Sequence, residues 1–287
     1  MNISIIGASG FVGFFHYKYI KEKFKKDKVY GTYLSNKTHP GLKKVDINNI
    51  NFLDRFIKLT NPDTILWFAG IKNTNLCEDD HDLALRLNVR PIRHVVGFLE
   101  DIKFQGRFFY YSSDHVFSGK KGSYKENSFR KPRTYYGETK YLAEKVLEES
   151  KIDYLIIRTS NVTGLKSTFI RWLVNELSQK GECYLYNNAI FSPTPLLLLL
   201  EATAFFIKNP QAFRYRRLHV VGDLSVSRYE FGLKVIKILQ LDGKIIPIAF
   251  DKDKVLIANN SSLKPSKILC QIQSRTFSQY LKASLIM

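Results

Sequence analysis

The stretch MNISIIGASGFVG, residues 1–13, decides the fold. Its first part, Asn2–Ile6, is a short, largely β-branched run of the kind that forms a buried strand. A glycine turn follows at once, and a helix is then expected to run to about Lys25. A strand, a Gly-x-x-Gly-x-x-Gly turn and a helix form the context in which such glycines bind a dinucleotide. The stretch therefore predicts the β-α-β unit of an NAD(P)-binding domain.

The glycines of this turn have separate expected roles. Gly7 allows the tight turn, Gly10 lets the backbone approach a pyrophosphate, and Gly13 lets the helix pack closely on the strand. The N-terminus of the helix would supply amide donors and a positive dipole to the phosphates. The other turn residues that we expect beside the cofactor are Ser9, Phe11 and Val12. The alternative is a small-residue turn that only packs.

Strands and helices alternate along about the first 160 residues, which predicts a parallel, doubly wound α/β sheet of the Rossmann type. The further strands expected here are Val29–Leu34, Lys43–Ile47, Thr64–Phe68, a run beginning near Phe108, and Asp153–Arg158. The expected helices are Asn51–Leu59, Asp80–Asp101 and Tyr135 to about Ser150. Ligands of such sheets bind at the carboxyl ends of strands. Gly7, Ala69 and Ser113 stand at ends of that kind.

After Ser160 the alternation becomes looser, which predicts a smaller α+β lobe. Its expected helices are Thr168–Gln179, Pro195–Lys208, Ser227–Leu239 and Phe277–Lys282. Its expected strands are Cys183–Tyr186, Arg217–Val221 and Ile245–Ile248. We therefore divide the chain into an NAD(P)-binding Rossmann domain, residues 1–160, and a substrate-binding lobe, residues 161–287.

The end of the second strand bears on the choice of cofactor. It lacks the acidic residue that would grip the adenosine ribose 2′-hydroxyl of NAD, whereas Ser35 and Lys37 could hold a 2′-phosphate. This favours NADP(H), with NAD(H) as the alternative. A solvated turn with no cofactor role is the other interpretation of these two residues. Asp46, at the end of the third strand, could accept a hydrogen bond from the adenine amine.

The stretch from Phe108 to Lys145 carries the candidate reaction chemistry. An apolar strand ends at Ser112-Ser113-Asp114, and a helix then begins at Tyr135. Five Tyr-x-x-x-Lys pairs occur in the chain, but only Tyr136 and Lys140 stand at a helix start after a strand-end Ser-Ser. A phenol has an ordinary pKa of about 10, which a nearby ammonium and a cationic nicotinamide would lower. We expect Lys140 to do this and to hold the nicotinamide ribose, while Ser113 fixes the substrate oxygen in line with Tyr136.

Five ordered motifs together resemble those of the extended short-chain dehydrogenases/reductases: GASGFVG, the Asn of LNVRP, YYSSDHVFSG, the Tyr and Lys of YYGETK, and RTSNVTG. Within that superfamily the chain is most similar to the dTDP-4-dehydrorhamnose reductase group. The resemblance implies hydride delivery from NADPH to a 4-keto-6-deoxy hexose on a nucleoside diphosphate, in surface polysaccharide synthesis. It also implies that Asn88 supports the catalytic set of Ser113, Tyr136 and Lys140. The further cofactor contacts that it implies are Ile47, Ala69, Gly70 and Ile71, and the substrate contacts are Ser112, Asp114, His115 and Asn161.

The chain departs from the group at three informative positions. His115 replaces the usual Tyr, which we expect to alter the substrate pocket. Asn161 stands where these reductases usually have Trp, so recognition of the base or sugar is expected to differ. Phe15 stands where some dimeric members have a metal-binding Glu, so no bound metal is expected.

The composition is that of a globular protein, with 287 residues, 45% hydrophobic residues and a formal net charge of +18 at pH 7. Such a charge suits a polyanionic partner, such as a nucleotide-linked substrate, nucleic acid or an anionic membrane surface, and does not choose among them. With the motifs above we expect a nucleotide-sugar substrate and no nucleic acid. Cys77, Cys183 and Cys270 are widely spaced, which is typical of reduced thiols in a cytoplasmic protein. No signal peptide is expected, because the strand at the start of the sequence runs directly into a turn, without a charged segment followed by a long apolar one. No membrane span is expected either, because the apolar run Pro195–Ile207 is too short for a bilayer.

Other functions fit the same motifs. One is a sugar-nucleotide epimerase or dehydratase of the same superfamily, although Asp114 and His115 offer only half of the acid/base pair that a dehydratase uses. Another is a non-catalytic NADP-binding regulatory subunit, like the β subunit of methionine adenosyltransferase. The resemblance further implies a homodimer formed through the helices expected at 80–101 and 135–150.

Overall fold

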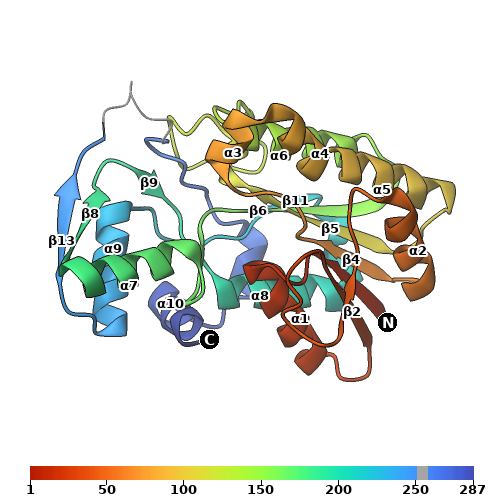
Figure 1. Ribbon diagram of the computed structural model, residues 1–287, viewed down its shortest axis with the longest axis horizontal. Coiled ribbons are helices and arrows are strands. Elements are labelled where there is room, and N and C mark those ends of the chain that lie inside the picture. The colour runs from red at the N-terminus through yellow and green to blue at the C-terminus, as the bar shows by residue number, and fades with distance from the viewer. Residues whose placement is uncertain (251–257) are drawn as a thin grey trace. The chain divides into compact units, whose positions relative to one another are not determined.

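The computed structural model describes residues 1–250 and 258–287, without the side chains of residues 213 and 214. The chain forms two compact units, each built from three chain segments (Figure 1). The first unit comprises Met1–Val116, Thr134–Arg158 and Ala204–Leu218. The second comprises Phe117–Arg133, Thr159–Thr203 and His219–Met287. The assignment of cofactor binding to residues 1–160 and substrate binding to residues 161–287 stays a prediction.

A seven-stranded sheet forms the centre of the first unit, with the order β11-β6-β5-β4-β1-β2-β3. Its strands are β1 (Asn2–Ile6), β2 (Lys28–Tyr33), β3 (Leu42–Lys44), β4 (Thr64–Trp67), β5 (Arg107–Ser113), β6 (Asp153–Thr159) and β11 (Arg217–His219). Strand β1 pairs in parallel with both β2 and β4, so that Ile5 lies between Gly31 and Leu66. The pairs β2–β3 and β4–β5 are parallel too. The expected doubly wound Rossmann-type sheet is therefore confirmed.

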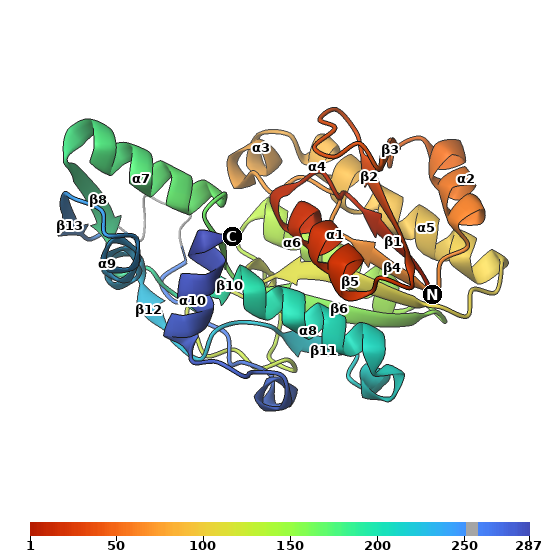
Figure 2. The same cartoon turned by 90° about the horizontal axis from the view of Figure 1, so that it is seen from below.

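Helices cover both faces of this sheet (Figures 1 and 2). They are α1 (Phe11–Lys23), α2 (Ile50–Thr60), α3 (Thr74–Asp79), α4 (His81–Asn88), α5 (Arg90–Asp101) and α6 (Tyr135–Glu148), with short 3₁₀ turns η1 (Asp114–Val116) and η2 (Pro210–Arg214). On one face, Leu53 of α2, Val95 of α5 and Leu147 of α6 join one buried cluster with the strand residues Ile65 and Phe108. Helix α1 lies on the opposite face (Figure 1). The helices thus pack against the strands whose carboxyl ends carry the candidate site.

The single helix predicted over 80–101 is wrong. The structure has α4 and α5 there, separated at Val89, and Pro91 lies in the first turn of α5. Proline lacks the amide hydrogen that a continuous helix needs, and it fits best in a first turn. The unpredicted helix α3 precedes them, and Asp80 both ends α3 and caps α4 by accepting from the Leu83 amide at 2.8 Å. Residues 74–101 therefore form three helices, of which two lie within the predicted one.

The second unit is of the α+β type, but the strand expected in it at Arg217–Val221 is wrong, because β11 (Arg217–His219) is the edge strand of the first unit's sheet. Its helices are α7 (Thr168–Lys180), α8 (Leu196–Lys208, which continues into the first unit), α9 (Arg228–Leu239), the 3₁₀ turn η3 (Lys267–Gln271) and α10 (Phe277–Ile286). Its strands are β7 (Val162–Thr163), β8 (Glu182–Tyr186), β9 (Ile190–Phe191), β10 (Thr194–Pro195), β12 (Val226–Ser227) and β13 (Lys244–Ile248). They form the two-stranded pairs β7–β10, β9–β12 and β8–β13. Leu173 of α7, Phe231 of α9 and Leu281 of α10 share its buried core.

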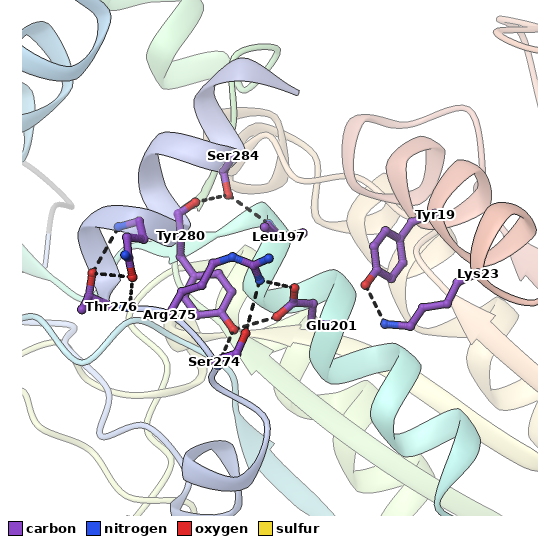
Figure 3. Close-up of polar contacts among 10 residues, drawn as sticks. Tyr19, Lys23, Leu197, Glu201, Ser274, Arg275, Thr276, Tyr280 and Ser284 are labelled. Carbon is purple, nitrogen blue, oxygen red and sulfur yellow. Dashed lines mark hydrogen bonds and ion pairs between the residues drawn. The ribbon is translucent and has the colours of Figure 1, made fainter.

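Polar contacts fix α10 against the N-terminal part of α8 (Figure 3). The Glu201 carboxylate accepts from the Arg275 guanidinium at 2.6 Å and from the Tyr280 hydroxyl at 2.7 Å. The Ser284 hydroxyl accepts from the Leu197 amide at 3.0 Å. Within residues 1–250 and 258–287, no helix combines the length and the apolar character needed to cross a membrane.

Candidate active site

The glycine turn between β1 and α1 has the tight geometry that its sequence predicts. Gly7 has a φ of +85°, and a Cβ atom there would lie 2.6 Å from the Ala69 nitrogen. A Cβ atom on Gly13 would lie 2.3 Å from the Gly7 carbonyl oxygen. Beside Gly10, by contrast, the nearest such atom is 3.6 Å away, and no side chain caps the first turn of α1. The turn thus leaves backbone amides open to an anion such as a pyrophosphate.

The other residues predicted to contact the pyrophosphate or the adenosine of the cofactor differ in their exposure and in their contacts within the chain. Ser9, Phe11 and Val12 are half-buried. Ser35 and Lys37 lie exposed after β2. The Asp46 carboxylate accepts from the backbone and side-chain nitrogens of Asn48 at 2.9 and 3.1 Å, while Ile47 is buried in the core. Their cofactor roles stay predictions.

Asn88, at the end of α4, joins three elements. Its Oδ1 atom accepts from the Ile71 amide at 2.8 Å, and its Nδ2 atom donates to the Ile71 carbonyl at 3.1 Å and to the Thr139 hydroxyl at 3.0 Å. A Cβ atom on Gly70, where φ is +138°, would lie 2.5 Å from Asn88 Oδ1. Asn88 therefore fixes the turn after β4 to α6.

Ser113 and Tyr136 meet at the end of β5. The Ser113 hydroxyl donates to the Asp114 carboxylate at 3.0 Å, accepts from the His115 amide at 3.3 Å and is hydrogen-bonded to the Tyr136 side chain. Burial raises the pKa of Tyr136 well above its ordinary value, with the Asp114 charge adding to it and the Ser113 hydrogen bond opposing it. In the chain without cofactor, burial thus sets the direction of the Tyr136 shift. The lowering of its pKa by Lys140 together with a bound nicotinamide stays a prediction.

Lys140 lies one turn after Tyr136 on the same face of α6, as its spacing predicts. The side chain is buried, and its Nζ atom donates to the Tyr111 carbonyl at 3.2 Å. The same atom lies 4.9 Å from the centre of the Tyr110 ring and 5.9 Å from that of Tyr136. Burial lowers the pKa of Lys140 to about 8, while the charge of Glu144 opposes that effect. The ammonium thus lies between two phenol rings in a desolvated site.

The beginning of α6 is fastened to the segments around it. Thr134 accepts from the Gly137 amide at 3.1 Å, and its hydroxyl lies 3.2 Å from Nδ1 of His115. The His115 ring meets the Tyr136 ring edge-on, with 5.4 Å between their centres. His115 is thus a direct neighbour of Tyr136.

The other two candidate substrate residues do not share that position. Ser112 is buried, but because side chains alternate along a strand it points to the opposite face from Ser113. Asn161 belongs to the second unit, where its carbonyl accepts from the Thr194 amide at 3.0 Å. The substrate roles of Ser112, Asp114, His115 and Asn161 stay predictions.

Sequence reasoning missed a buried ion pair behind Lys140. The Arg158 guanidinium on β6 donates to both carboxylate oxygens of Glu144, at 2.8 and 2.7 Å. Both side chains have no exposed surface. Glu144 follows Lys140 by four residues, and this spacing was the available signal.

An unpredicted groove of about 810 Å³ lies along α7 in the second unit. Its lining residues are Leu165, Lys166, Thr168, Arg171, Trp172, Val174, Asn175 and Ser178. Trp172 is 41% exposed there, although an indole ring is usually well covered. Aromatic, basic and amide groups thus share one open face.

In the part of the chain that the structure describes, no three His, Cys, Asp or Glu side chains are grouped as metal ligands would be.

Similarity to known proteins agrees with this architecture. The family model for the RmlD substrate binding domain matches residues 1–286. The chain is 28% identical to the spore coat polysaccharide biosynthesis protein SpsK of Bacillus subtilis over 193 residues, 67% of this chain and 66% of that protein. It is 25% identical to the dTDP-4-dehydrorhamnose reductase of Escherichia coli over 259 residues, 88% of this chain and 82% of that one. The structure of the Bacillus anthracis dTDP-4-dehydrorhamnose reductase in complex with NADP has a similar fold, with a TM-score of 0.84, 21% identity and coverage of 99% and 98%.

Proposed function

The chain belongs to the RmlD substrate binding domain family, and from this premise we propose that it is an NAD(P)H-dependent reductase of a nucleoside-diphosphate 4-keto-6-deoxy sugar. At the level of the family, the expected resemblance and the expected class, an NAD(P)-dependent oxidoreductase, are confirmed. The individual sugar and base belong to the proposal. So does a role in surface polysaccharide synthesis, which the name of the B. subtilis relative supports.

One observation carries the proposal: a serine, a tyrosine and a lysine meet in a desolvated site at the end of β5. Ser113 is hydrogen-bonded to the Tyr136 side chain, and Lys140 lies one turn away. We infer that Tyr136 gives its proton to the substrate carbonyl oxygen while Ser113 orients that oxygen. Lys140 would support the charge that develops on the phenol.

The protonation state of Tyr136 is compatible with its role as the acid in ketone reduction. Because burial raises its pKa, Tyr136 holds its proton at neutral pH. Ketone reduction needs a proton donor at this position, whereas alcohol oxidation would begin with the phenolate. An epimerase of the same superfamily stays the alternative, because it would use the same tyrosine in both directions.

The glycine turn fits the cofactor part of the proposal. Gly7, Gly10 and the uncapped first turn of α1 would hold the pyrophosphate, and Ser35 and Lys37 would select NADP(H) over NAD(H). NADPH, when bound, supplies the hydride. The NADP held by the B. anthracis structure supports this choice.

We place the nucleotide of the substrate on the groove along α7. Trp172 could stack on a base, and Lys166 and Arg171 could pair with the diphosphate. This agrees with the proposed division into a cofactor domain, residues 1–160, and a substrate lobe, residues 161–287. The proposal further comprises a cytoplasmic homodimer paired through the helices within 80–101 and 135–148, with neither nucleic acid nor membrane as a partner.

The test is NADPH oxidation, followed by absorbance, with a panel of nucleoside-diphosphate 4-keto-6-deoxy sugars. We expect one sugar to turn over, and Tyr136→Phe to lower kcat about 1,000-fold while NADPH still binds. Tyr135→Phe is the matched control, because it removes a phenol from the same helical turn and leaves the ring stacked on His81. NADPH binding without turnover of any sugar would contradict the proposal and favour a regulatory subunit.

A further inference from the structure

Helix α6 continues the line of Tyr136 and Lys140 by one more turn, to Glu144. Residues four apart on a helix share a face, with about 5–6 Å between neighbouring Cβ atoms. This face therefore presents a phenol, an ammonium and a carboxylate in succession. The carboxylate is fully buried and is held through both oxygens by Arg158.

Stability alone gives no reason for this pair. Burying two charges costs about as much as their attraction returns, and well-packed apolar residues of similar volume often serve as well. The pair does, however, fix an anion beside a buried ammonium. A two-point contact from Arg158 also prevents the Glu144 carboxylate from turning away.

The other groups that face Lys140 are phenols, a thiol and a carbonyl. They are Tyr110 and the Tyr111 carbonyl from β5, Tyr136 from α6, and Cys77 from α3. Burial raises the pKa of Tyr110, of Tyr136 and of the Cys77 thiol, so all three are neutral at neutral pH. Glu144 is thus the carboxylate that opposes the loss of the Lys140 proton.

We propose that Glu144, one helical turn from Lys140 and held through both oxygens by Arg158, is a positioning residue that keeps the Lys140 side chain in its ammonium form. The inference rests on the proposed function for its catalytic consequence. Loss of the Glu144 charge lowers the pKa of Lys140 below about 8, so the ammonium is lost at a lower pH. Activity that needs the ammonium then falls at a lower pH as well.

The pH dependence of kcat/KM tests the proposal in the full chain. For Glu144→Gln we expect the alkaline decline to move to lower pH by about one unit, with about a tenfold loss of kcat at pH 8. We expect KM within about twofold of the wild type and recovery of kcat near pH 6. Glu149→Gln is the matched control: it makes the same change at the C-cap of α6, at an exposed carboxylate 3.5 Å from Lys145. An alkaline decline at the wild-type pH in Glu144→Gln would overturn the proposal.

A second variant separates positioning from folding, because Glu144→Gln leaves Arg158 buried without its partner. The double variant Glu144→Leu/Arg158→Met removes both charges and keeps similar volumes, and thermal unfolding shows whether it folds. We expect the folded double variant to show a decline displaced in the same direction but by less, because in Glu144→Gln the unpaired Arg158 charge also opposes the Lys140 ammonium. If it folds and has the wild-type pH profile, the ion pair is structural only and the proposal is wrong.

A measurement without turnover distinguishes this inference from the proposed function. The ¹³Cε signal of Lys140 in lysine-labelled protein, assigned with Lys140→Arg, reports its titration directly. We expect the midpoint to fall in the double variant, by the amount seen in the kinetics. If the wild-type enzyme reduces no sugar, the proposed function fails, and this titration still decides the role of Glu144. An unchanged midpoint would refute it.

Discussion

The candidate site at the end of β5 and the groove along α7 are opposite in construction. At the first, Ser113, Lys140 and Asn88 are buried, and each is hydrogen-bonded to a residue of another helix, turn or strand. In the groove, Leu165 and Trp172 are 43% and 41% exposed. The side chains of the strand-end site are therefore held by their neighbours, whereas those of the groove are accessible to a ligand from solvent.

This difference separates two kinds of contribution to catalysis. A buried, interlocked set can be complementary to a transition state, so its loss is expected in kcat. Exposed aromatic and basic groups bind substrate and transition state about equally, so their loss is expected in KM. Substitutions of the two regions should therefore fall into two kinetic classes.

Among the substitutions that test this comparison, the largest effect is expected at Gly13, in the glycine turn between β1 and α1. Gly13→Ala would place a methyl group 2.3 Å from the Gly7 carbonyl oxygen. Backbone cannot yield as a side chain can, so we expect NADPH affinity to fall about 100-fold, measured by fluorescence titration. Gly97→Ala on α5 is the control, because a Cβ atom there meets nothing within 4 Å. Equal NADPH affinity in the two variants would show that the glycine turn accommodates a methyl group, which contradicts the rigidity that we infer for it.

A smaller effect is expected at Asn88. Asn88→Ala removes its contacts to both backbone groups of Ile71 and to Thr139, which frees the turn after β4 from α6. We expect kcat to fall about 30-fold and the free energy of unfolding to fall by about 2 kcal/mol. Steady-state kinetics and urea denaturation measure the two quantities. Asn75→Ala, at an exposed position of α3, should change neither. A pure KM effect at Asn88 would erase the proposed distinction between the two regions.

The smallest effect is expected in the groove. Trp172→Ala should raise KM for the nucleotide sugar about tenfold through lost stacking and leave kcat unchanged. Tryptophan fluorescence offers a direct check, since Trp67 is buried and Trp172 is exposed. A nucleoside diphosphate should quench the emission of the wild type but not that of Trp172→Phe. Quenching that persists in Trp172→Phe would remove the nucleotide from this groove.

The local part of the architecture follows from the sequence. The strand, glycine turn and helix of residues 1–13, and the four-residue spacing of Tyr136 and Lys140, depend on backbone geometry that short motifs determine. The division of 80–101 at Val89 was in principle readable from Pro91, but the strong apolar periodicity on both sides suggested one helix. Short-range signals succeed where only neighbouring residues matter.

The electrostatic part of the site required the fold. The pKa of Tyr136 depends on its burial and on its distance from the Asp114 charge. Neither can be derived from the Tyr-x-x-x-Lys motif. Arg158 contacts Glu144 because β6 packs beneath α6 in the fold. The spacing of the two residues in the sequence does not predict this contact. The groove along α7 was missed for the same reason, since a tryptophan in an amphipathic helix normally predicts burial.

The division of each unit among three chain segments has a consequence for how the protein is made. The edge of β6 is completed by β11, with Ile156 donating to the Arg216 carbonyl at 3.0 Å, and Arg107 on β5 donates to the Phe206 carbonyl at 3.0 Å. When only residues 1–160 have emerged from the ribosome, β11 is missing and the edge of β6 is unpaired. Such edges recruit other strands, and nascent chains that expose them depend on protection until the missing segment emerges. The first residues to be synthesised belong to the first unit, yet that unit is complete only after its segment Ala204–Leu218 has followed Thr159–Thr203 of the second.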